Sequence, residues 1–278
     1  MNGEGAMADP VREARDQLRG LICAGAEPAG AVRLDLDGPV AHLRIDHPRA
    51  RGAMTLSMMV DLADAVLALG AWDGALVLLS STDPRAFCAG GHLGQLLAAI
   101  DAPEKAHTMC VAMGVVTDAL AALPAVSVSA IDGLAVGGGA ELVTATDFRV
   151  ASPEARIHFV QARLGIAPGW GGTRRLARIV GRQAALRVLT TARPLFPGEA
   201  VELGLVDHRC EGRAVDGALE WLADLRSRPP EAIRAVKQQI LATSRDEEAS
   251  AFASVWGGPA HVRALRAERP SALPQGDP

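Results

Sequence analysis

Two short apolar runs, each followed by a glycine cluster, constrain the fold of this chain more than any other feature. Residues 75–80 precede the segment 86–92, which contains two adjacent glycines, and residues 125–131 precede the segment 132–141, which contains three. Apolar runs of this length are typical of buried parallel strands. Glycines after such strands allow a sharp turn and leave backbone N–H groups free to face a ligand. The pattern predicts an α/β core with two amide-lined turns.

The rest of the chain alternates strand and helix patterns. Residues 31–36 and 40–45 flank Asp37-Gly38, which is a strong hairpin signal. Thr55 is a candidate N-cap for an amphipathic helix over 56–69. Further helices are expected over 92–100, 103–123 and 137–146, further strands over 148–151, 156–159 and 205–209, and mostly helix after Gly171. This alternation predicts an α/β fold with a helical C-terminal region.

A chain of 278 residues is expected to form one large domain, with at most a small appendage. Residues 1–30 are predicted to be a flexible N-terminal extension with one helical turn near 11–21. The α/β core is expected over 31–210, a C-terminal helical region over 211–269, and a frayed tail over 270–278.

The composition argues against several classes of protein. A net charge of -4 and only two lysines disfavour a nucleic-acid or membrane-surface binder, which needs clustered cations. The four cysteines form no C-x-x-C pair, which argues against a zinc ribbon or a disulfide framework. The uncharged run 119–131 is shorter than the roughly 20 residues that span a bilayer. With no secretory signal at the N-terminus, we expect a cytoplasmic protein without a metal site.

The second glycine cluster favours oxyanion chemistry over nucleotide binding. Gly137, Gly138 and Gly139 are contiguous, so the G-x-G-x-x-G spacing of a dinucleotide site is absent. An amide at a helix start can stabilise a developing oxyanion, and one such donor is typically worth about 3–4 kcal/mol. Close packing of helix on strand is the alternative explanation. Two such amides could hold one oxygen between them, which suits a thioester carbonyl that becomes an enolate.

Several further segments carry a resemblance to a known family. They are 86–93 with 130–141, Asp147-Phe148-Arg149, 165–173, and Leu203-Gly204-Leu205-Val206. Together these resemble the crotonase (enoyl-CoA hydratase/isomerase) superfamily, over nearly everything from about residue 31 to about residue 266. The resemblance implies a spiral of ββα turns, a C-terminal helical trimerisation region, and a homotrimer or hexamer. It also implies an acyl-CoA or acyl-carrier thioester as substrate, with no cofactor besides the CoA of the substrate.

The resemblance assigns roles to individual residues. Gly91 and Gly138 match the two positions whose N–H groups form the oxyanion hole. The residues implied in substrate or CoA binding are Arg49, Ala50, Arg51, Ala89, His92, Leu93 and Trp170. Arg49 and Arg51 could donate charge-assisted hydrogen bonds to CoA phosphates, although solvated surface arginines would look the same. Lys237, on a late helix, is a weaker candidate for the same ligand.

The carboxylates separate the activities within this superfamily. Glu141 matches the first catalytic glutamate, but the second position is Gln161, and an amide cannot transfer a proton at useful pH. Two-carboxylate hydration is therefore disfavoured. Decarboxylation of a malonyl-type thioester needs the oxyanion hole and a single proton. Residues 137–141 and 255–259 also resemble the ethylmalonyl-CoA/methylmalonyl-CoA decarboxylase branch. Glu141 would then deliver the proton or orient a neighbouring group.

Decarboxylation is not the only function to consider for these residues. The runner-up is an enoyl-CoA hydratase or isomerase that uses Glu141 as its single carboxylate. A serine hydrolase needs a serine at a glycine-rich elbow, and no serine occurs between residues 131 and 151. A nucleic-acid-binding role is opposed by the charge balance. A non-catalytic CoA-binding scaffold stays possible, because the two amides could bind a thioester without turning it over.

Overall fold

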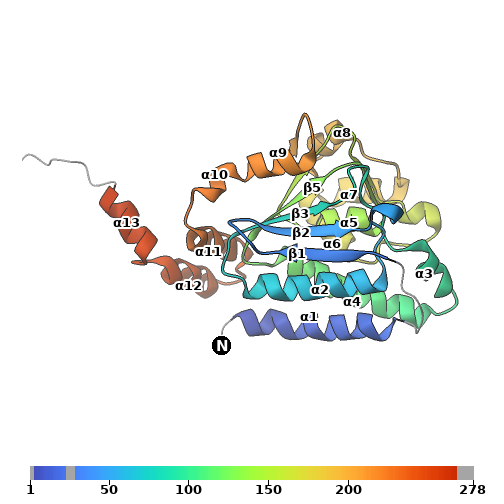
Figure 1. The fold of residues 1–278 in the computed structure, drawn as a ribbon, viewed down its shortest axis with the longest axis horizontal. Coiled ribbons are helices and arrows are strands. Elements are labelled where there is room, and N and C mark those ends of the chain that lie inside the picture. Colours follow the sequence, from blue (N-terminus) through green and yellow to red (C-terminus); the bar gives the residue numbers. More distant parts are fainter. Residues whose placement is uncertain (1–2, 23–28, 268–278) are drawn as a thin grey trace, which may run out of the picture.

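The computed structural model describes residues 3–22 and 29–267 and contains two sheets (Figure 1). The larger, six-stranded sheet has the order β1-β2-β3-β5-β7-β9, and the smaller, three-stranded sheet has the order β4-β6-β8. The strands are β1 (Ala31–Asp35), β2 (Ala41–Asp46), β3 (Leu76–Ser81), β4 (Ala86–Cys88), β5 (Val126–Ile131), β6 (Leu134–Val136), β7 (Phe148–Ala151), β8 (Arg156–His158) and β9 (His208–Arg209). Only the β1–β2 pair is antiparallel among these strand pairs.

Helices cover both faces of the larger sheet. They are α1 (Gly3–Gly20), α2 (Leu56–Ala71), α3 (Leu93–Ala98), α4 (Pro103–Ala121), α5 (Gly138–Val143), α6 (Gly172–Val180), α7 (Arg182–Thr191), α8 (Pro197–Glu202), α9 (Ala214–Trp221), α10 (Ala223–Arg226), α11 (Pro230–Leu241), α12 (Arg245–Val255) and α13 (Pro259–Ala267), with 3-10 turns η1 (Pro48–Ala50) and η2 (Gln161–Leu164). Figure 1 shows α1, α2 and α4 on one side of this sheet and α9 on the other. The predicted α/β architecture is confirmed.

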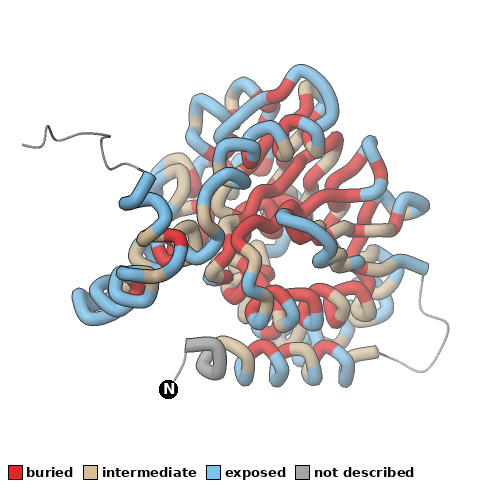
Figure 2. The backbone as a smooth tube through the Cα atoms, turned by 60° about the vertical axis from the view of Figure 1, so that its left-hand side comes forward, coloured by how far each residue is buried: buried red, intermediate tan, exposed pale blue. Residues whose placement is uncertain are grey.

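The apolar runs behave as the sequence predicts for buried parallel strands. All six residues of β3 are buried, and its four apolar residues alternate between two cores. Leu76 and Leu78 pack with α9, whereas Val77 and Leu79 pack in the larger core that includes α2 and α4. This alternation follows from the two-residue period of a strand. Figure 2 shows that burial is concentrated along these central strands.

The N-terminal segment differs from the expectation of a flexible extension. Residues 3–20 form the helix α1, which packs against α2 and α4. Val11, Ala14 and Leu18 are buried on one face, at the spacing of three and four residues that a helix requires. The spacing of these apolar residues is hard to recognise in the sequence, because many charged and small residues surround them. Residues 23–28 and the predicted tail 270–278 lie outside the described residues.

The C-terminal helices carry apolar side chains that the described chain leaves exposed. Ile240 of α11 is 78% exposed, and Phe252 and Trp256, whose ring centroids lie 5.1 Å apart, are 52% and 65% exposed. Figure 1 shows α12 and α13 projecting from the body of the molecule. Among the described helices, none combines the length and the apolar character that a membrane crossing requires. The division into a core over 31–210 and a helical region over 211–269 stays a prediction.

Candidate active site

The two glycine turns predicted from the sequence lie against each other. The first turn follows the short strand β4 and the second follows the short strand β6, both in the smaller sheet. The sequence pattern predicts the residues of these two strands as parts of the turns. Because β4 and β6 pair in parallel, the turns leave the sheet at the same edge. Gly90 has φ +90°, and a Cβ there would lie 2.9 Å from the Val136 carbonyl oxygen and 3.2 Å from the Gly138 amide nitrogen. Only glycine allows this approach.

The amides of Gly91 and Gly138 are free to bind a ligand. Both residues are half-buried, and neither amide donates a hydrogen bond to another group within the described parts of the chain. The neighbouring amides are occupied, since His92 N–H donates to the Met54 carbonyl at 2.8 Å and Gly137 N–H donates to the His158 carbonyl at 2.9 Å. The helix α5 starts at Gly138 and spans six residues, fewer than the sequence pattern predicts.

A third segment joins this pair of turns. Ala89 N–H donates to the Arg51 carbonyl at 3.0 Å, and Met54 N–H donates to the Gly90 carbonyl at 2.7 Å. These bonds place η1, with Arg49 and Ala50, beside the first glycine turn. The side chains of Arg49 and Arg51 are exposed, so both guanidinium groups are accessible.

Glu141 is buried and fully hydrogen-bonded. The residue is 1% exposed, and four N–H donors contact its carboxylate. Oε1 accepts from Gln161 Nε2 at 2.9 Å and from the Gly169 amide at 3.0 Å. Oε2 accepts from the amides of Trp170 at 2.7 Å and Gly172 at 3.0 Å. Burial raises the pKa of Glu141, and the three backbone N–H groups lower it in part. The carboxylate therefore anchors the loop 169–172.

This loop places Trp170 beside one of the free amides. The Trp170 carbonyl accepts hydrogen bonds from Thr117 Oγ1 at 2.7 Å and from Arg175 Nη2 at 2.6 Å. Arg175 also pairs with Asp118. A Cβ on Gly138 would lie 2.5 Å from the indole ring, so the ring covers that glycine directly.

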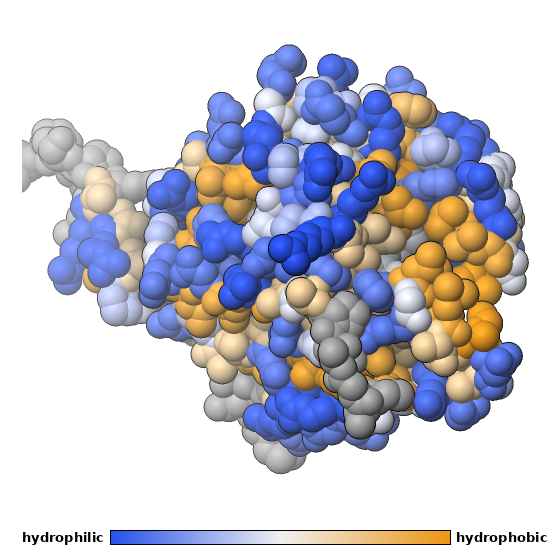
Figure 3. All heavy atoms as spheres, turned by 45° about the vertical axis from the view of Figure 1, so that its right-hand side comes forward, coloured by the Kyte–Doolittle hydropathy of each residue, from blue (hydrophilic) through white to orange (hydrophobic). Residues whose placement is uncertain are grey.

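The first glycine turn has a different neighbour from the one expected. Leu93 is 67% exposed, whereas a Cβ on Gly91 would lie 3.2 Å from the Leu96 side chain. Leu96, one turn further along α3, is therefore the apolar residue that flanks Gly91. The sequence does not identify this neighbour, because the residue at which α3 starts decides which leucine faces the turn. Figure 3 shows apolar side chains gathered on this side of the molecule.

His92 is the residue directly before α3. Its ring stacks on that of His47, with centroids 6.0 Å apart, and its Nδ1 has no hydrogen-bond partner among the described residues. His47 Nδ1 lies 2.8 Å from the Ala53 carbonyl oxygen, and a carbonyl can only accept, so this nitrogen carries the proton.

Lys237 is not available to a ligand, which corrects the expectation that it could meet CoA. It is 5% exposed, and its Nζ lies 2.6 Å from Asp147 Oδ2 and 2.8 Å from the Ala125 carbonyl oxygen. Burial lowers the pKa of Lys237, and Asp147 raises it in part. The lysine ties α11 to the start of β5.

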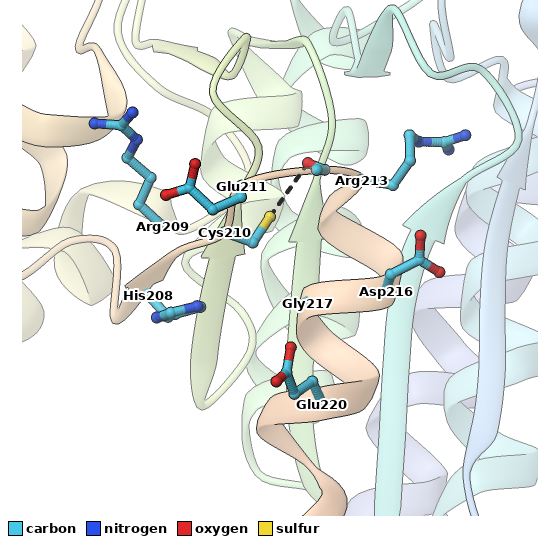
Figure 4. Close-up of a pocket in the computed structure, with 9 residues that line it drawn as sticks. His208, Arg209, Cys210, Glu211, Arg213, Asp216, Gly217 and Glu220 are labelled. Carbon is cyan, nitrogen blue, oxygen red and sulfur yellow. Dashed lines mark hydrogen bonds between the residues drawn. The ribbon is translucent and has the colours of Figure 1, made fainter.

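A separate surface pocket of about 330 Å³ lies where β9 leads into α9 (Figure 4). His208, Arg209, Glu211 and Glu220 line it, and Cys210 Sγ lies 3.3 Å from the Gly212 carbonyl oxygen. None of the residues predicted for the site lines this pocket.

The chain is similar to known proteins over most of its length. The sequence model of the enoyl-CoA hydratase/isomerase family matches residues 36–255. The chain belongs to this family. The chain is 37% identical over 255 residues to an ethylmalonyl-CoA decarboxylase of Danio rerio, covering 86% of this chain and 84% of that protein. It is 33% identical over 250 residues to the ethylmalonyl-CoA decarboxylase of Homo sapiens, covering 86% of this chain and 81% of that protein.

Solved structures resemble the fold of this family member closely. The enoyl-CoA hydratase from Bacillus anthracis superimposes with a TM-score of 0.78 at 27% identity, covering 85% of this chain and 95% of that protein. A putative enoyl-CoA hydratase/isomerase family protein from Hyphomonas neptunium gives a TM-score of 0.79 at 28% identity, covering 85% of this chain and 93% of that protein. The expected crotonase fold is confirmed. Helix α1 precedes the region that the family model matches.

Proposed function

We propose that this enzyme decarboxylates malonyl-type acyl-CoA thioesters with a small α-substituent, such as methylmalonyl-CoA or ethylmalonyl-CoA. One observation carries the proposal: two adjacent turns each leave one amide free, while Glu141 is held by four donors and its partner residue is Gln161. The site can therefore stabilise an enolate but lacks the carboxylate pair that activates water for hydration. The similarity to ethylmalonyl-CoA decarboxylases supports the same reaction.

In the proposed reaction the thioester oxygen accepts hydrogen bonds from Gly91 and Gly138. The bond between the α-carbon and the carboxylate breaks, carbon dioxide leaves, and the electron pair passes through the α-carbon to the thioester oxygen. Two preorganised amides stabilise that oxygen without reorganising, and each is worth about 3–4 kcal/mol. The α-carbon then takes up one proton to give the product thioester.

The surrounding residues are proposed to bind the rest of the substrate. Arg49 and Arg51 would meet the CoA phosphates, with Ala50 and Ala89 lining the path between them and the first glycine turn. An acyl-CoA thioester as the ligand is supported by the family, whereas the choice between CoA and an acyl carrier protein is part of the proposal. No cofactor takes part in the proposed reaction.

The acyl group would lie between the residues that flank the two amides. Trp170 covers Gly138 and Leu96 borders Gly91, so these side chains would contact the α-substituent. Their apolar surfaces would solvate the leaving carboxylate poorly, which favours its loss. His92 and the exposed Leu93 stand at the start of α3, where they would meet substrate at the edge of the site.

Glu141 is proposed to act by holding the loop 169–172. Because each of its oxygens already accepts two hydrogen bonds, delivering a proton to substrate would require breaking one of them. Glu141 would thus keep Trp170 against Gly138 and orient Gln161, which is the orienting role left open by the sequence.

The alternative is an enoyl-CoA hydratase or isomerase that uses Glu141 as its single carboxylate. The structural similarity to proteins described as enoyl-CoA hydratases favours it. The experiment that separates the two functions is a parallel assay of methylmalonyl-CoA, ethylmalonyl-CoA and crotonyl-CoA with the purified enzyme. We expect release of carbon dioxide from the first two and no hydration of crotonyl-CoA. Turnover of crotonyl-CoA alone would reject the decarboxylase in favour of the alternative.

A homotrimer or hexamer in the cytoplasm is the proposed state of the enzyme. The exposed apolar residues of α11 and α12 would be buried between copies of the chain. The described cysteines, Cys88, Cys110 and Cys210, are free thiols, as a reducing compartment requires.

A further inference from the structure

The orientation of the Gln161 amide is fixed by its neighbour. Nε2 lies 2.9 Å from Glu141 Oε1, and a carboxylate oxygen accepts hydrogen bonds, so the NH₂ group must face Glu141. The amide oxygen, Oε1, then points away from the carboxylate. An exchange of the two ends of the amide would place two acceptors against each other.

This oxygen is a buried acceptor with nothing to accept from. Gln161 is 5% exposed, and its Oε1 has no hydrogen-bond partner among the described residues. Leaving a buried polar atom unpaired costs about 1–3 kcal/mol, so native proteins rarely do so without a functional reason. A donor that binds at this atom would recover that cost.

The position of Gln161 ties this acceptor to the oxyanion site. Gln161 begins η2, directly after Val160, whose Cγ1 would lie 3.7 Å from a Cβ on Gly137. Its hydrogen bond to Glu141 links it to the same carboxylate that holds the Trp170 loop. Gln161 thus belongs to the group of residues packed around the second glycine turn.

We propose that Gln161 Oε1 holds the water molecule that protonates the α-carbon after carbon dioxide has left. This inference rests on the proposed decarboxylase function and names the proton source for it. The water donates one hydrogen to Oε1 and its other hydrogen to the α-carbon. The electron pair of the enolate forms the new C–H bond, and the water O–H bond breaks. The hydroxide that remains combines with carbon dioxide as bicarbonate, so atoms and charges balance.

Glu141, the ionisable group that contacts Gln161, is not free to deliver the proton. Glu141 is saturated by four N–H donors, as described above. A glutamine cannot ionise, so it acts here as a positioning residue whose effect passes through the water.

A water held at one atom delivers its proton to one face of the enolate. Decarboxylation of methylmalonyl-CoA in D₂O then yields a propionyl-CoA with one deuterium at the α-carbon, predominantly in a single configuration. Removing the acceptor frees the water, and protonation from bulk solvent reaches both faces. The configuration of the product therefore reports on Gln161 in a way that loss of stability does not.

The experiment compares the wild-type enzyme with Gln161→Leu and Gln161→Glu in D₂O. Leucine removes the acceptor, and we expect mixed product configurations, with kcat reduced on the order of 100-fold where protonation limits turnover. Glutamate keeps an acceptor and can share one proton with Glu141, so the single configuration should be retained. Gln183→Leu makes the same chemical change at an exposed position of α7 and should match the wild type.

Each outcome decides one claim. A wild-type enzyme that releases no carbon dioxide rejects the proposed function itself. An active wild type with mixed product configurations overturns the inference about Gln161, as does a Gln161→Leu variant that keeps the single configuration. Should Gln161→Leu fail to fold, the glutamate variant decides: loss of selectivity in folded Gln161→Glu overturns the inference, and retention supports it.

Discussion

At the residue scale, Gly138 meets two demands at once. Its N–H must stay free for the substrate oxygen, and its Cα must leave room for the indole of Trp170, which lies 2.5 Å from where a Cβ would be. These demands can be separated by substitution. Alanine keeps the N–H but pushes on the indole, whereas proline also removes the N–H and is tolerated at the first position of a helix.

We therefore predict that Gly138→Pro loses about 100-fold or more in kcat beyond the loss in Gly138→Ala, since one oxyanion donor is worth about 3–4 kcal/mol. Binding of the substrate should weaken only moderately in both variants. Steady-state kinetics with methylmalonyl-CoA measures the difference, and circular dichroism checks that both variants fold. Equal kcat in the two variants would mean that the Gly138 amide stabilises no developing charge, and would contradict its place in the oxyanion hole.

The sequence predicts the residues of the site that act through the backbone better than those that act through side chains. Glycine clusters mark Gly91 and Gly138 because so few other residues permit those turns. The support for Trp170 comes from Thr117, 53 residues away along the chain, and from Arg175, five residues away, which are both ordinary helix residues in the sequence. Only the folded chain shows that their side chains meet one carbonyl.

At the element scale, the same contrast holds. The spacing of apolar residues predicts β3 and β5, and the glycine-containing hairpin predicts β1 and β2. The short strands β4 and β6 escape detection because three residues carry no periodicity, and they are defined by pairing with each other. Helix α1 escapes because, among its described side chains, only Val11, Ala14 and Leu18 are fully buried, between many charged neighbours.

Helix α11 offers a direct test of whether Lys237 is structural. Lys237→Met breaks a buried ion pair and leaves Asp147 with less compensation, so we expect the free energy of unfolding to fall by roughly 3 kcal/mol. Lys105→Met, at the exposed other lysine of the chain, should change it by less than about 0.5 kcal/mol. Urea unfolding measures both variants.

The Michaelis constant for the acyl-CoA substrate should be unchanged in folded Lys237→Met. A large rise in that constant without loss of stability would return Lys237 to the CoA site and contradict its assignment as an anchor of α11.

At the scale of the whole molecule, the C-terminal helices carry apolar side chains that the rest of the described chain does not cover. Ile240 on α11 and Trp256 at the end of α12 leave large apolar surfaces in contact with solvent. Burial of such side chains between copies would contribute about 25 cal/mol for each Å² removed from water.

We predict that the purified protein is a trimer or a multiple of one, and that the double variant Ile240→Lys, Trp256→Lys shifts it toward the monomer. Charged groups at these positions would be costly to bury in an interface. Light scattering coupled to size-exclusion chromatography measures the mass. Leu186→Lys, at a 58% exposed leucine of α7, is the matched control and should keep the assembly. A monomeric wild-type protein would contradict the proposed interface.

In the proposed reaction, the amides of Gly91 and Gly138 polarise one thioester carbonyl. The infrared stretching frequency of the carbonyl in bound propionyl-CoA, labelled with ¹³C at that carbon, measures this polarisation directly. We predict a lower carbonyl stretching frequency in the wild-type complex than in water. Most of this shift should be retained in Gly138→Ala, and much of it should be lost in Gly138→Pro. A frequency in the wild-type complex equal to that in water would contradict this prediction.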